Sequence, residues 1–269
     1  MTTKAKTITA IAAAAAALLL VSIIWPRSES PEQIAARLKQ CTVGLAGGFT
    51  VWGVLANDNY SWTGSGVIIR RDGDHYIILS NAHVVGIDEI SDAKWFIEPS
   101  ILAYKLEVTM PDGHKADAKT VLVNSHLKDF ALVYVDASVG NYPTLPLSTK
   151  HAEVGAQVFA MGDPLRLTDT FTSGMVSAYR GYTTPLGAEI EFLQHTAPIN
   201  PGNSGGPLVD DHFNLIGINT MTIRDGQNLN FAISAQSISQ SEKQWISFPI
   251  APNNIGPFVV KLKKGQFKL

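Results

Sequence analysis

Residues 198–208 carry the strongest chemical signal in the chain, because they place one serine inside a glycine-rich turn. The run reads Pro-Ile-Asn-Pro-Gly-Asn-Ser-Gly-Gly-Pro-Leu, with Ser204 between Gly202 and the pair Gly205 and Gly206. Glycine adopts backbone angles that side chains forbid, so several N–H groups of such a loop can point toward one place. Acyl transfer needs this combination: a hydroxyl that attacks a carbonyl and N–H donors that face the developing oxyanion. The same residue types are also common in tight turns, which leaves a simple turn as the alternative.

A serine hydroxyl is a weak nucleophile and needs a neighbouring base that a third group holds in place. Among the seven histidines, His83 follows an apolar run, residues 76–79, and a Ser-Asn-Ala turn. This context predicts a base at the end of a buried strand, and a hydrogen-bonded core histidine is the alternative. His195, close before the serine loop, is interpreted as a pocket-wall or structural histidine.

The best candidate for the third group is Asp129, which directly precedes the apolar run 130–135. A carboxylate at the mouth of a strand can reach inward and fix the orientation of an imidazole. A turn aspartate at the start of a strand is the alternative. Asp136, Asp163 and Asp169 compete on spacing but lie in poorer contexts.

The elements that must position these residues are predicted to be strands. From Cys41 onward, short apolar runs alternate with Gly, Asn and Asp, and residues 72–74 and 111–113 are hairpin-turn signals. Many short strands with few helical windows indicate an antiparallel barrel or sandwich. Residues 235–245 predict a helix, and residues 258–262 of the tail predict an edge strand.

The composition excludes several classes of function. The chain has 269 residues, 45% of them hydrophobic, which is enough for a large core. A net charge of −2 without a basic stripe argues against nucleic acid as a partner. Cys41 is the one cysteine, which excludes an intramolecular disulfide, and it is interpreted as a small apolar residue of the first strand. Neither a metal-ligand spacing nor a phosphate-binding glycine loop occurs, so no metal and no cofactor are expected.

The N-terminus predicts a membrane anchor. Lys4 and Lys6 precede an uncharged apolar run, residues 8–25, that would span about 27 Å as a helix. Pro31 follows the small residues at which a signal peptidase would act, so an uncleaved anchor is favoured over a cleaved signal.

The two lysines favour an orientation with the N-terminus inside the cell. This orientation predicts a single-pass protein of the inner (cytoplasmic) membrane, with the rest of the chain in the periplasm or outside the cell. Residues 1–27 would be the signal anchor, and residues 28–40 would be a polar stalk that enters a turn or two of helix.

The chain resembles the HtrA/Deg branch of the chymotrypsin-fold serine proteases. Six ordered matches lie within residues 64–233, namely 64–69 with 79–85, 111–119 with 129–133, 161–164 with 172–178, 202–208, 215–220 and 228–233. The resemblance implies an all-β fold of two antiparallel β-barrels of the six-stranded type, with the active site between them. With it we expect a protease domain over 41–247, an N-terminal transmembrane helix, a short C-terminal helix and a C-terminal tail over 248–269.

The resemblance also implies roles for individual residues. Ser204 would be the nucleophile, His83 the general base and then acid, and Asp129 the orienting carboxylate. The backbone N–H groups of Gly202 and Ser204 would form the oxyanion hole. Asn203 stands where digestive trypsin-like enzymes have an aspartate that pairs with a new N-terminus, so activation by N-terminal cleavage is not expected.

Substrate specificity follows from the same positions. Ile199 would lie at the base of the primary specificity pocket, and Asn219, Thr220 and Met221 would form its wall. An apolar floor without an acidic residue favours a small or medium aliphatic side chain before the cleaved bond.

Two segments depart from the family pattern. HtrA proteases usually carry a C-terminal PDZ domain, and too few residues follow Ile233 for one, so none is expected. Residues 86–104 look like an enlarged loop beyond the histidine. Relatives include trimers, so a homotrimer is one assembly that the resemblance implies.

The leading hypothesis is a membrane-anchored, extracytoplasmic serine endopeptidase that acts on protein or peptide substrates in envelope protein quality control or processing. The alternative is a catalytically latent binding or chaperone protein with a protease fold. A third hypothesis is a processing protease for one envelope partner, which the loop at 86–104 would recognise.

Overall fold

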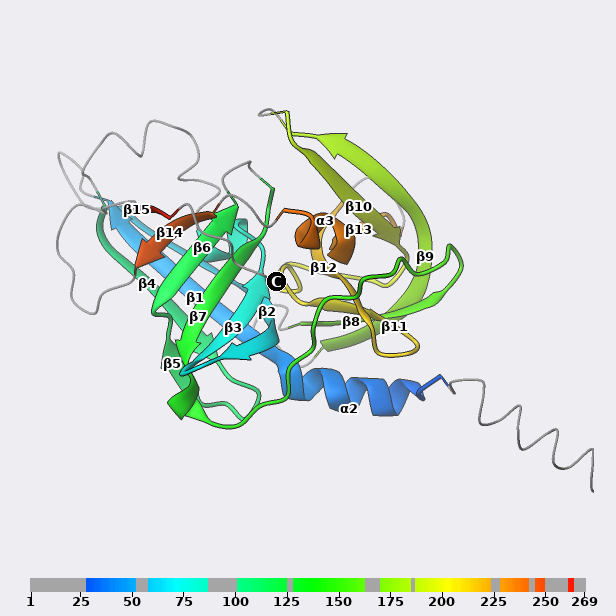
Figure 1. Cartoon of the computed structure of the whole chain (residues 1–269), viewed down its shortest axis with the longest axis horizontal. Coiled ribbons are helices and arrows are strands. Elements are labelled where there is room, and N and C mark those ends of the chain that lie inside the picture. Colours follow the sequence, from blue (N-terminus) through cyan, green and yellow to red (C-terminus); the bar gives the residue numbers. More distant parts are fainter. Residues whose placement is uncertain are drawn as a thin grey trace, which may run out of the picture.

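Two β-structures lie side by side, and a helix packs below their junction (Figure 1). The computed structural model describes residues 28–51, 58–86, 101–124, 128–162, 170–184, 187–223, 228–241, 245–249 and 261–263.

The first half is an antiparallel sheet of nine strands in the order β15-β14-β6-β7-β3-β2-β1-β4-β5. These strands are β1 (Thr42–Val51), β2 (Asp58–Asp72), β3 (His75–Ser80), β4 (Ile101–Thr109), β5 (Lys115–Asp117), β6 (Thr120–Asn124), β7 (Ala131–Asp136), β14 (Trp245–Pro249) and β15 (Lys261–Lys263).

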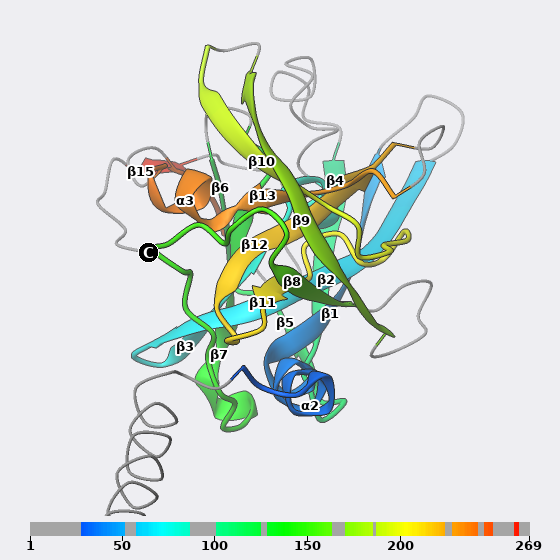
Figure 2. The same cartoon turned by 90° about the vertical axis from the view of Figure 1, so that its right-hand side faces the viewer.

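The second half is a closed antiparallel barrel in the order β10-β13-β12-β11-β8-β9. Its strands are β8 (Gln157–Gly162), β9 (Thr170–Thr183), β10 (Glu189–His195), β11 (Pro207–Asp210), β12 (Leu215–Thr222) and β13 (Asn230–Ser234). In the turned view, β9 and β10 form a long hairpin that rises from the barrel (Figure 2).

The predicted chymotrypsin-like fold is confirmed for the barrel and corrected for the first half. A six-stranded closed barrel was expected there, but the sheet is a half-barrel. The outer edge of β6 pairs with β14 from the C-terminal end of the chain, Val123 opposite Ile246. Because β14 occupies this edge, β6 cannot pair with β4 or β5 to close the sheet on itself.

Residues 28–40, expected to be a polar stalk, contain most of a three-turn helix, α2 (Pro31–Cys41). Ser30 caps the helix in a capping box with Gln33, and Pro31 occupies the first turn, where its missing N–H costs nothing. Ile34, Leu38 and Cys41 are buried, so this segment is part of the core. Cys41 therefore ends a helix and does not lie in the first strand.

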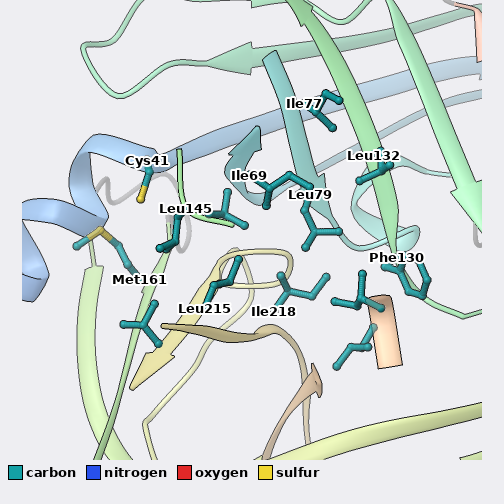
Figure 3. Close-up of a cluster of buried hydrophobic side chains, with 14 of the residues drawn as sticks. Cys41, Ile69, Ile77, Leu79, Phe130, Leu132, Leu145, Met161, Leu215 and Ile218 are labelled. Atoms are coloured by element: carbon teal, nitrogen blue, oxygen red, sulfur yellow. The ribbon is translucent and has the colours of Figure 1, made fainter. Parts of the chain in front are cut away.

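The largest hydrophobic cluster lies between the two halves. Figure 3 shows Leu79 of the sheet close to Ile218 of the barrel. Leu132 and Leu215 belong to the same cluster, and all four side chains are at most 1% exposed. Two further clusters fill the sheet and the barrel separately. The halves are thus joined by a continuous apolar interface, which fixes the strand ends that meet there.

The C-terminal helix is shorter than predicted. Helix α3 covers Ala235–Ser239, and Trp245 begins β14. Trp245 is 2% exposed and packs edge-on against Phe130, with the two ring centroids 5.6 Å apart. Burial of this aromatic side chain favours the strand. The predicted edge strand at 258–262 overlaps β15, which pairs with β14.

Within the part of the chain that the structure describes, no helix is both long and apolar enough to span a membrane. The predicted anchor at residues 1–27 lies outside that part, as do residues 87–100 of the predicted loop at 86–104. The end of that loop is corrected: residues 101–104 belong to β4, with Tyr104 opposite Phe49 of β1.

Candidate active site

His83 lies directly beyond the end of a buried central strand. Strand β3 pairs with β2 and β7, and its last residue is followed by Asn81, Ala82 and the 3₁₀ turn η1 (His83–Val85). Gly86 ends this turn in the left-handed region, with φ of 69°, and its N–H donates to the His83 carbonyl at 3.1 Å. The side chain of His83 is 36% exposed. The histidine is therefore rigidly placed and still open to solvent.

Asp129 lies just before β7 and binds His83 through both its side chain and its backbone. Nδ1 of His83 lies 2.9 Å from Oδ2 and 3.0 Å from Oδ1 of the carboxylate. The backbone N–H of His83 donates to Oδ1 at 3.1 Å, and Nδ2 of Asn81 donates to the Asp129 carbonyl at 2.8 Å. An ionised carboxylate only accepts, so Nδ1 carries the proton and Nε2 is left as the basic nitrogen.

The loop that carries Ser204 depends on glycine for its shape. The N–H of Asn203 donates to the Asn200 carbonyl at 2.9 Å, and Gly202 has φ of 105°, which together make a type II turn. Gly205 has φ of 80°, and a Cβ there would lie 2.2 Å from the Ser65 carbonyl oxygen. No other residue type fits this position without displacing β2.

Two backbone donors of this loop have no acceptor in the part of the chain that the structure describes. They are the N–H groups of Gly202 and Ser204. The N–H groups of Asn203, Gly205 and Gly206 all donate to carbonyls within the fold. Unpaired donors are rare in partly or fully buried backbone, and an oxyanion hole is one reason for them.

Thr220 connects the acid to the nucleophile. Its Oγ1 donates to Oδ2 of Asp129 at 2.7 Å, and its carbonyl accepts the Ser204 hydroxyl at 3.1 Å. The register between β12 and β13 shifts at this point, where Asn219 pairs with Ala232 and Met221 with Phe231. Thr220 is the extra residue of this bulge, and the bulge turns it toward the site.

The structure places the four predicted specificity residues in different surroundings. Thr220 belongs to the hydrogen-bonded site, and Asn219 supports the loop, because its Nδ2 donates to the carbonyls of Gly206 at 3.1 Å and Pro207 at 3.2 Å. Ile199 is 9% exposed within the hydrophobic cluster of the barrel, and Met221 is 45% exposed.

Two serines that the sequence analysis did not single out also contact the site. Ser65 of β2 donates through its N–H to the Ser204 carbonyl at 2.8 Å and through its Oγ to the Gly202 carbonyl at 2.6 Å. Ser80, the last residue of β3, donates to the Ser65 carbonyl at 2.7 Å. Both serines are 0% exposed. The run Gly-Ser-Gly before an apolar strand was visible in the sequence, but it contains no signal for a contact with residues 202–204.

The other histidine near the loop, His195, is 0% exposed and ends β10. Neither ring nitrogen has a hydrogen-bond partner in the part of the chain described. Burial lowers the pKa of His195 to about 4, against a weaker opposing effect of the Ala197 backbone. It is a neutral structural residue of the barrel.

Among the described residues, one group of side chains, Asp210, Asp211 and His212, brings three possible metal-ligand atoms within 4.8 Å of one another. It lies at the turn between β11 and β12. Its side-chain hydrogen bonds among the described residues stay within this turn and do not reach Ser204. The Asp210 carboxylate already accepts from the N–H of His212 at 3.0 Å and of Asn214 at 2.9 Å. The turn thus uses this carboxylate for its own backbone.

Comparisons with known proteins agree with this architecture. Residues 64–218 match the trypsin-like peptidase domain family. The chain is 38% identical over 181 residues to the serine endoprotease DegS of Salmonella typhimurium, which covers 64% of the chain and 45% of DegS. It is 34% identical over 180 residues to the serine protease HTRA1 of Xenopus laevis, which covers 65% of the chain and 34% of that relative. The chain thus spans between about a third and just under half the length of these curated relatives.

Solved structures give the same result. A serine endoprotease from Yersinia pestis superposes with a TM-score of 0.55 at 31% identity, over 80% of the chain and 66% of that structure. A structure of an HtrA-type protease with a decapeptide superposes with a TM-score of 0.63 at 25% identity, over 81% of the chain and 70% of that structure. The chain therefore belongs to the trypsin-like peptidase family and, within it, to the HtrA-type serine proteases.

Proposed function

We propose that this chain is a serine endopeptidase in which Ser204, His83 and Asp129 are the catalytic residues. The observation that carries the proposal is one connected hydrogen-bond network. The Asp129 carboxylate accepts from both His83 and Thr220, and the carbonyl of the same Thr220 accepts the Ser204 hydroxyl. The network links acid, base and nucleophile from opposite halves of the fold.

The chemistry follows from the donors and acceptors present. Oγ of Ser204 attacks the peptide carbonyl while Nε2 of His83 takes the hydroxyl proton, and the same proton then goes to the leaving amine. Asp129 holds the imidazole and stabilises its positive charge. The N–H groups of Gly202 and Ser204 receive the oxyanion, and water then hydrolyses the acyl-enzyme by the reverse use of His83.

The Ser204 hydroxyl must turn before it can react. It donates to the Thr220 carbonyl at 3.1 Å, so attack requires that this hydrogen bond be exchanged for one to Nε2 of His83. A substrate chain that lies along β12 would present a backbone N–H to the Thr220 carbonyl, because the bulge keeps this residue out of register with β13. Binding of the substrate would thus release the hydroxyl for attack.

Labelling with a fluorophosphonate probe tests the proposal on the purified full-length chain. We expect covalent labelling of the wild type, none in Ser204→Ala, and strongly reduced labelling in His83→Ala. Ser138→Ala, which changes an exposed serine of the 3₁₀ turn η3 (Ala137–Val139), should label like the wild type. Equal labelling of the Ser204 variant would exclude this serine as the nucleophile.

A catalytically latent binding or chaperone protein is the second candidate, and the Ser204–Thr220 hydrogen bond is the observation that favours it. The N–H groups of Gly202 and Ser204 have no acceptor among the described residues, which favours the active form, because a collapsed oxyanion hole would use them internally. Cleavage of unfolded casein by the purified chain without an activator would decide for the endopeptidase. Intact casein together with suppressed aggregation of a denatured client would decide for the latent protein.

We propose that small or medium aliphatic residues precede the cleaved bond. Ile199 is the predicted floor of the specificity pocket, and its surroundings in the barrel, such as Leu193 and Ala232, are apolar. An apolar floor leaves the charge of lysine or arginine unpaired. Peptide substrates with Ala, Val or Leu before the cleaved bond should react faster than those with Lys or Arg, and a preference for Arg would contradict this proposal.

The cellular setting is also a proposal, and it rests on the sequence. Residues 8–25 would anchor the chain in the inner membrane with the protease domain in the periplasm, where it would act in protein quality control or processing, alone or as a homotrimer. We expect the chain to resist carbonate extraction of membranes and to be digested by protease added to spheroplasts. Its release by carbonate would contradict the anchor.

A further inference from the structure

The loop around Ser204 is held by the alternate peptide groups along it. The Gly202–Asn203 peptide is bonded at both ends: its carbonyl accepts from Oγ of Ser65, and its N–H donates to the Asn200 carbonyl. The Ser204–Gly205 peptide is also bonded at both ends, since its carbonyl accepts from the N–H of Ser65 and its N–H donates to the Asn219 carbonyl.

The two N–H groups of this loop that have no acceptor among the described residues are those of Gly202 and Ser204. Each lies in a peptide group next to one that is fixed at both ends, and the Asn203–Ser204 peptide is also held at its own carbonyl, which accepts from the N–H of Gly206. The orientation of a peptide plane depends on the torsions it shares with its neighbours, so fixing the alternate planes restricts the planes between them. Gly202 has φ of 105° and no side chain, so without such contacts its adjoining peptides could rotate.

Ser65 supplies two of the four anchors, and it does so from the other half of the fold. It lies on β2 of the sheet, whereas the loop belongs to the barrel. Its hydroxyl has little freedom, because the backbone of β8 packs behind it: a Cβ on Gly162 would lie 3.0 Å from this Oγ. The carbonyl of Ser65 is itself held by Ser80 at 2.7 Å.

We propose that Ser65 is a positioning residue of the oxyanion hole, whose hydroxyl fixes the Gly202–Asn203 peptide and thereby aims the N–H groups of Gly202 and Ser204 at the substrate carbonyl. This inference rests on the proposed function. It concerns the stabilisation of the transition state and leaves the acid–base pair of Asp129 and His83 unchanged.

Substitution of the hydroxyl gives a graded test. Loss of one oxyanion donor lowers kcat by about 10²–10³-fold, and Ser65 acts on the donors indirectly. We therefore expect Ser65→Ala to lower kcat for a peptide ester by about 10- to 100-fold with little change in KM. Ser65→Cys replaces the hydroxyl by a larger side chain with a weaker donor, so its kcat should lie between those of Ser65→Ala and the wild type. The pH profile of kcat/KM should keep its shape, because the acid–base pair is intact.

Ser234→Ala is the matched control. Ser234 is also 0% exposed, and its Oγ accepts the N–H of Ser237 at the start of α3. The kcat of each variant is measured at a temperature well below the midpoint of its own thermal unfolding. A kcat of Ser65→Ala within twofold of the wild type would overturn the proposal, and so would an equal loss in Ser234→Ala.

Amide hydrogen exchange tests the same idea without catalysis. In Ser65→Ala, the Asn203 N–H should exchange about tenfold faster than in the wild type, because its peptide loses one of two anchors. Ser234→Ala should leave this rate unchanged. If the wild type reacts with neither the phosphonate nor the ester, the proposed function fails and exchange alone decides the role of Ser65. Unchanged exchange at Asn203 would overturn that role.

Discussion

Acidification should destabilise this protein through one buried side chain. His195 is 0% exposed, and desolvation lowers its pKa from 6.5 to about 4. In the folded chain it is therefore neutral over a pH range in which the unfolded chain protonates it. The unfolded state binds the proton first as the pH falls, so folding becomes less favourable.

The size of the effect follows from the difference in pKa. About 2.5 pKa units at about 1.36 kcal/mol each correspond to about 3.4 kcal/mol of unfolding free energy. This contribution is complete above pH 6.5 and is lost as the pH falls from 6.5 toward 4, the two values for the unfolded and folded states. By pH 5 the loss should be about 2 kcal/mol. Below pH 4 both states bind the proton, and the loss from this group stops.

Urea unfolding at pH 7.5 and pH 5 measures the loss in the wild type and in His195→Leu. Leucine is of similar size, and neither ring nitrogen of His195 has a hydrogen bond to lose within the described chain. The variant should therefore lose about 2 kcal/mol less than the wild type between these pH values. His114→Gln, which replaces an exposed histidine and leaves His195 in place, should retain the loss that His195 causes. An equal loss in wild type and His195→Leu would refute the reasoning.

Three further outcomes follow from the structure. Thr220→Val removes a 2.7 Å hydrogen bond to the Asp129 carboxylate. Hydrogen bonds to charged groups contribute about 1.5–3 kcal/mol, so kcat/KM for a peptide ester should fall about tenfold or more. An unchanged value would contradict the role of Thr220. Gly205→Ala should destabilise the fold by about 2–4 kcal/mol in thermal unfolding, because φ is 80° and the added Cβ would lie 2.2 Å from the Ser65 carbonyl oxygen. An unfolding midpoint equal to that of the wild type would show that the loop adapts. Burial raises the pKa of Cys41 to about 12, so iodoacetamide at pH 8 should modify it only after unfolding, and prompt reaction of the folded chain would disprove its burial.

Local sequence context named His83, Asp129 and Ser204 as candidates but left a structural alternative open for each, and the family resemblance selected them. His83 follows a buried strand, Asp129 precedes one, and Ser204 lies in a turn that only glycine permits, so each environment is encoded within about ten residues. The structure brings the first two into direct contact and connects the third through Thr220. Their catalytic roles stay predictions until labelling tests them.

The contacts that complete the site could not be predicted in this way. Ser65 and Gly202 are 137 residues apart, and Thr220 and Asp129 are 91 apart, so no local pattern reports either contact. The position of Thr220 also depends on a bulge, and the run 215–220 reads as an uninterrupted strand. The half-barrel was missed for a similar reason, because the pairing of β14 with β6 joins segments more than 100 residues apart.

The candidate site belongs to neither half of the fold alone. Asp129 and His83 are fixed to the sheet, Ser204 and Thr220 to the barrel, and the Ser65 and Thr220 hydrogen bonds cross between them. A misplacement of about 1 Å between reacting groups can cost about a hundredfold in rate, so the packing of the two halves sets the activity as well as the stability. Helix α2 contacts both β2 and β8, and its buried residues Ile34 and Leu38 enter the shared hydrophobic cluster. The segment between the predicted anchor and the first strand thus holds the two halves, and with them the acid and the nucleophile, in register.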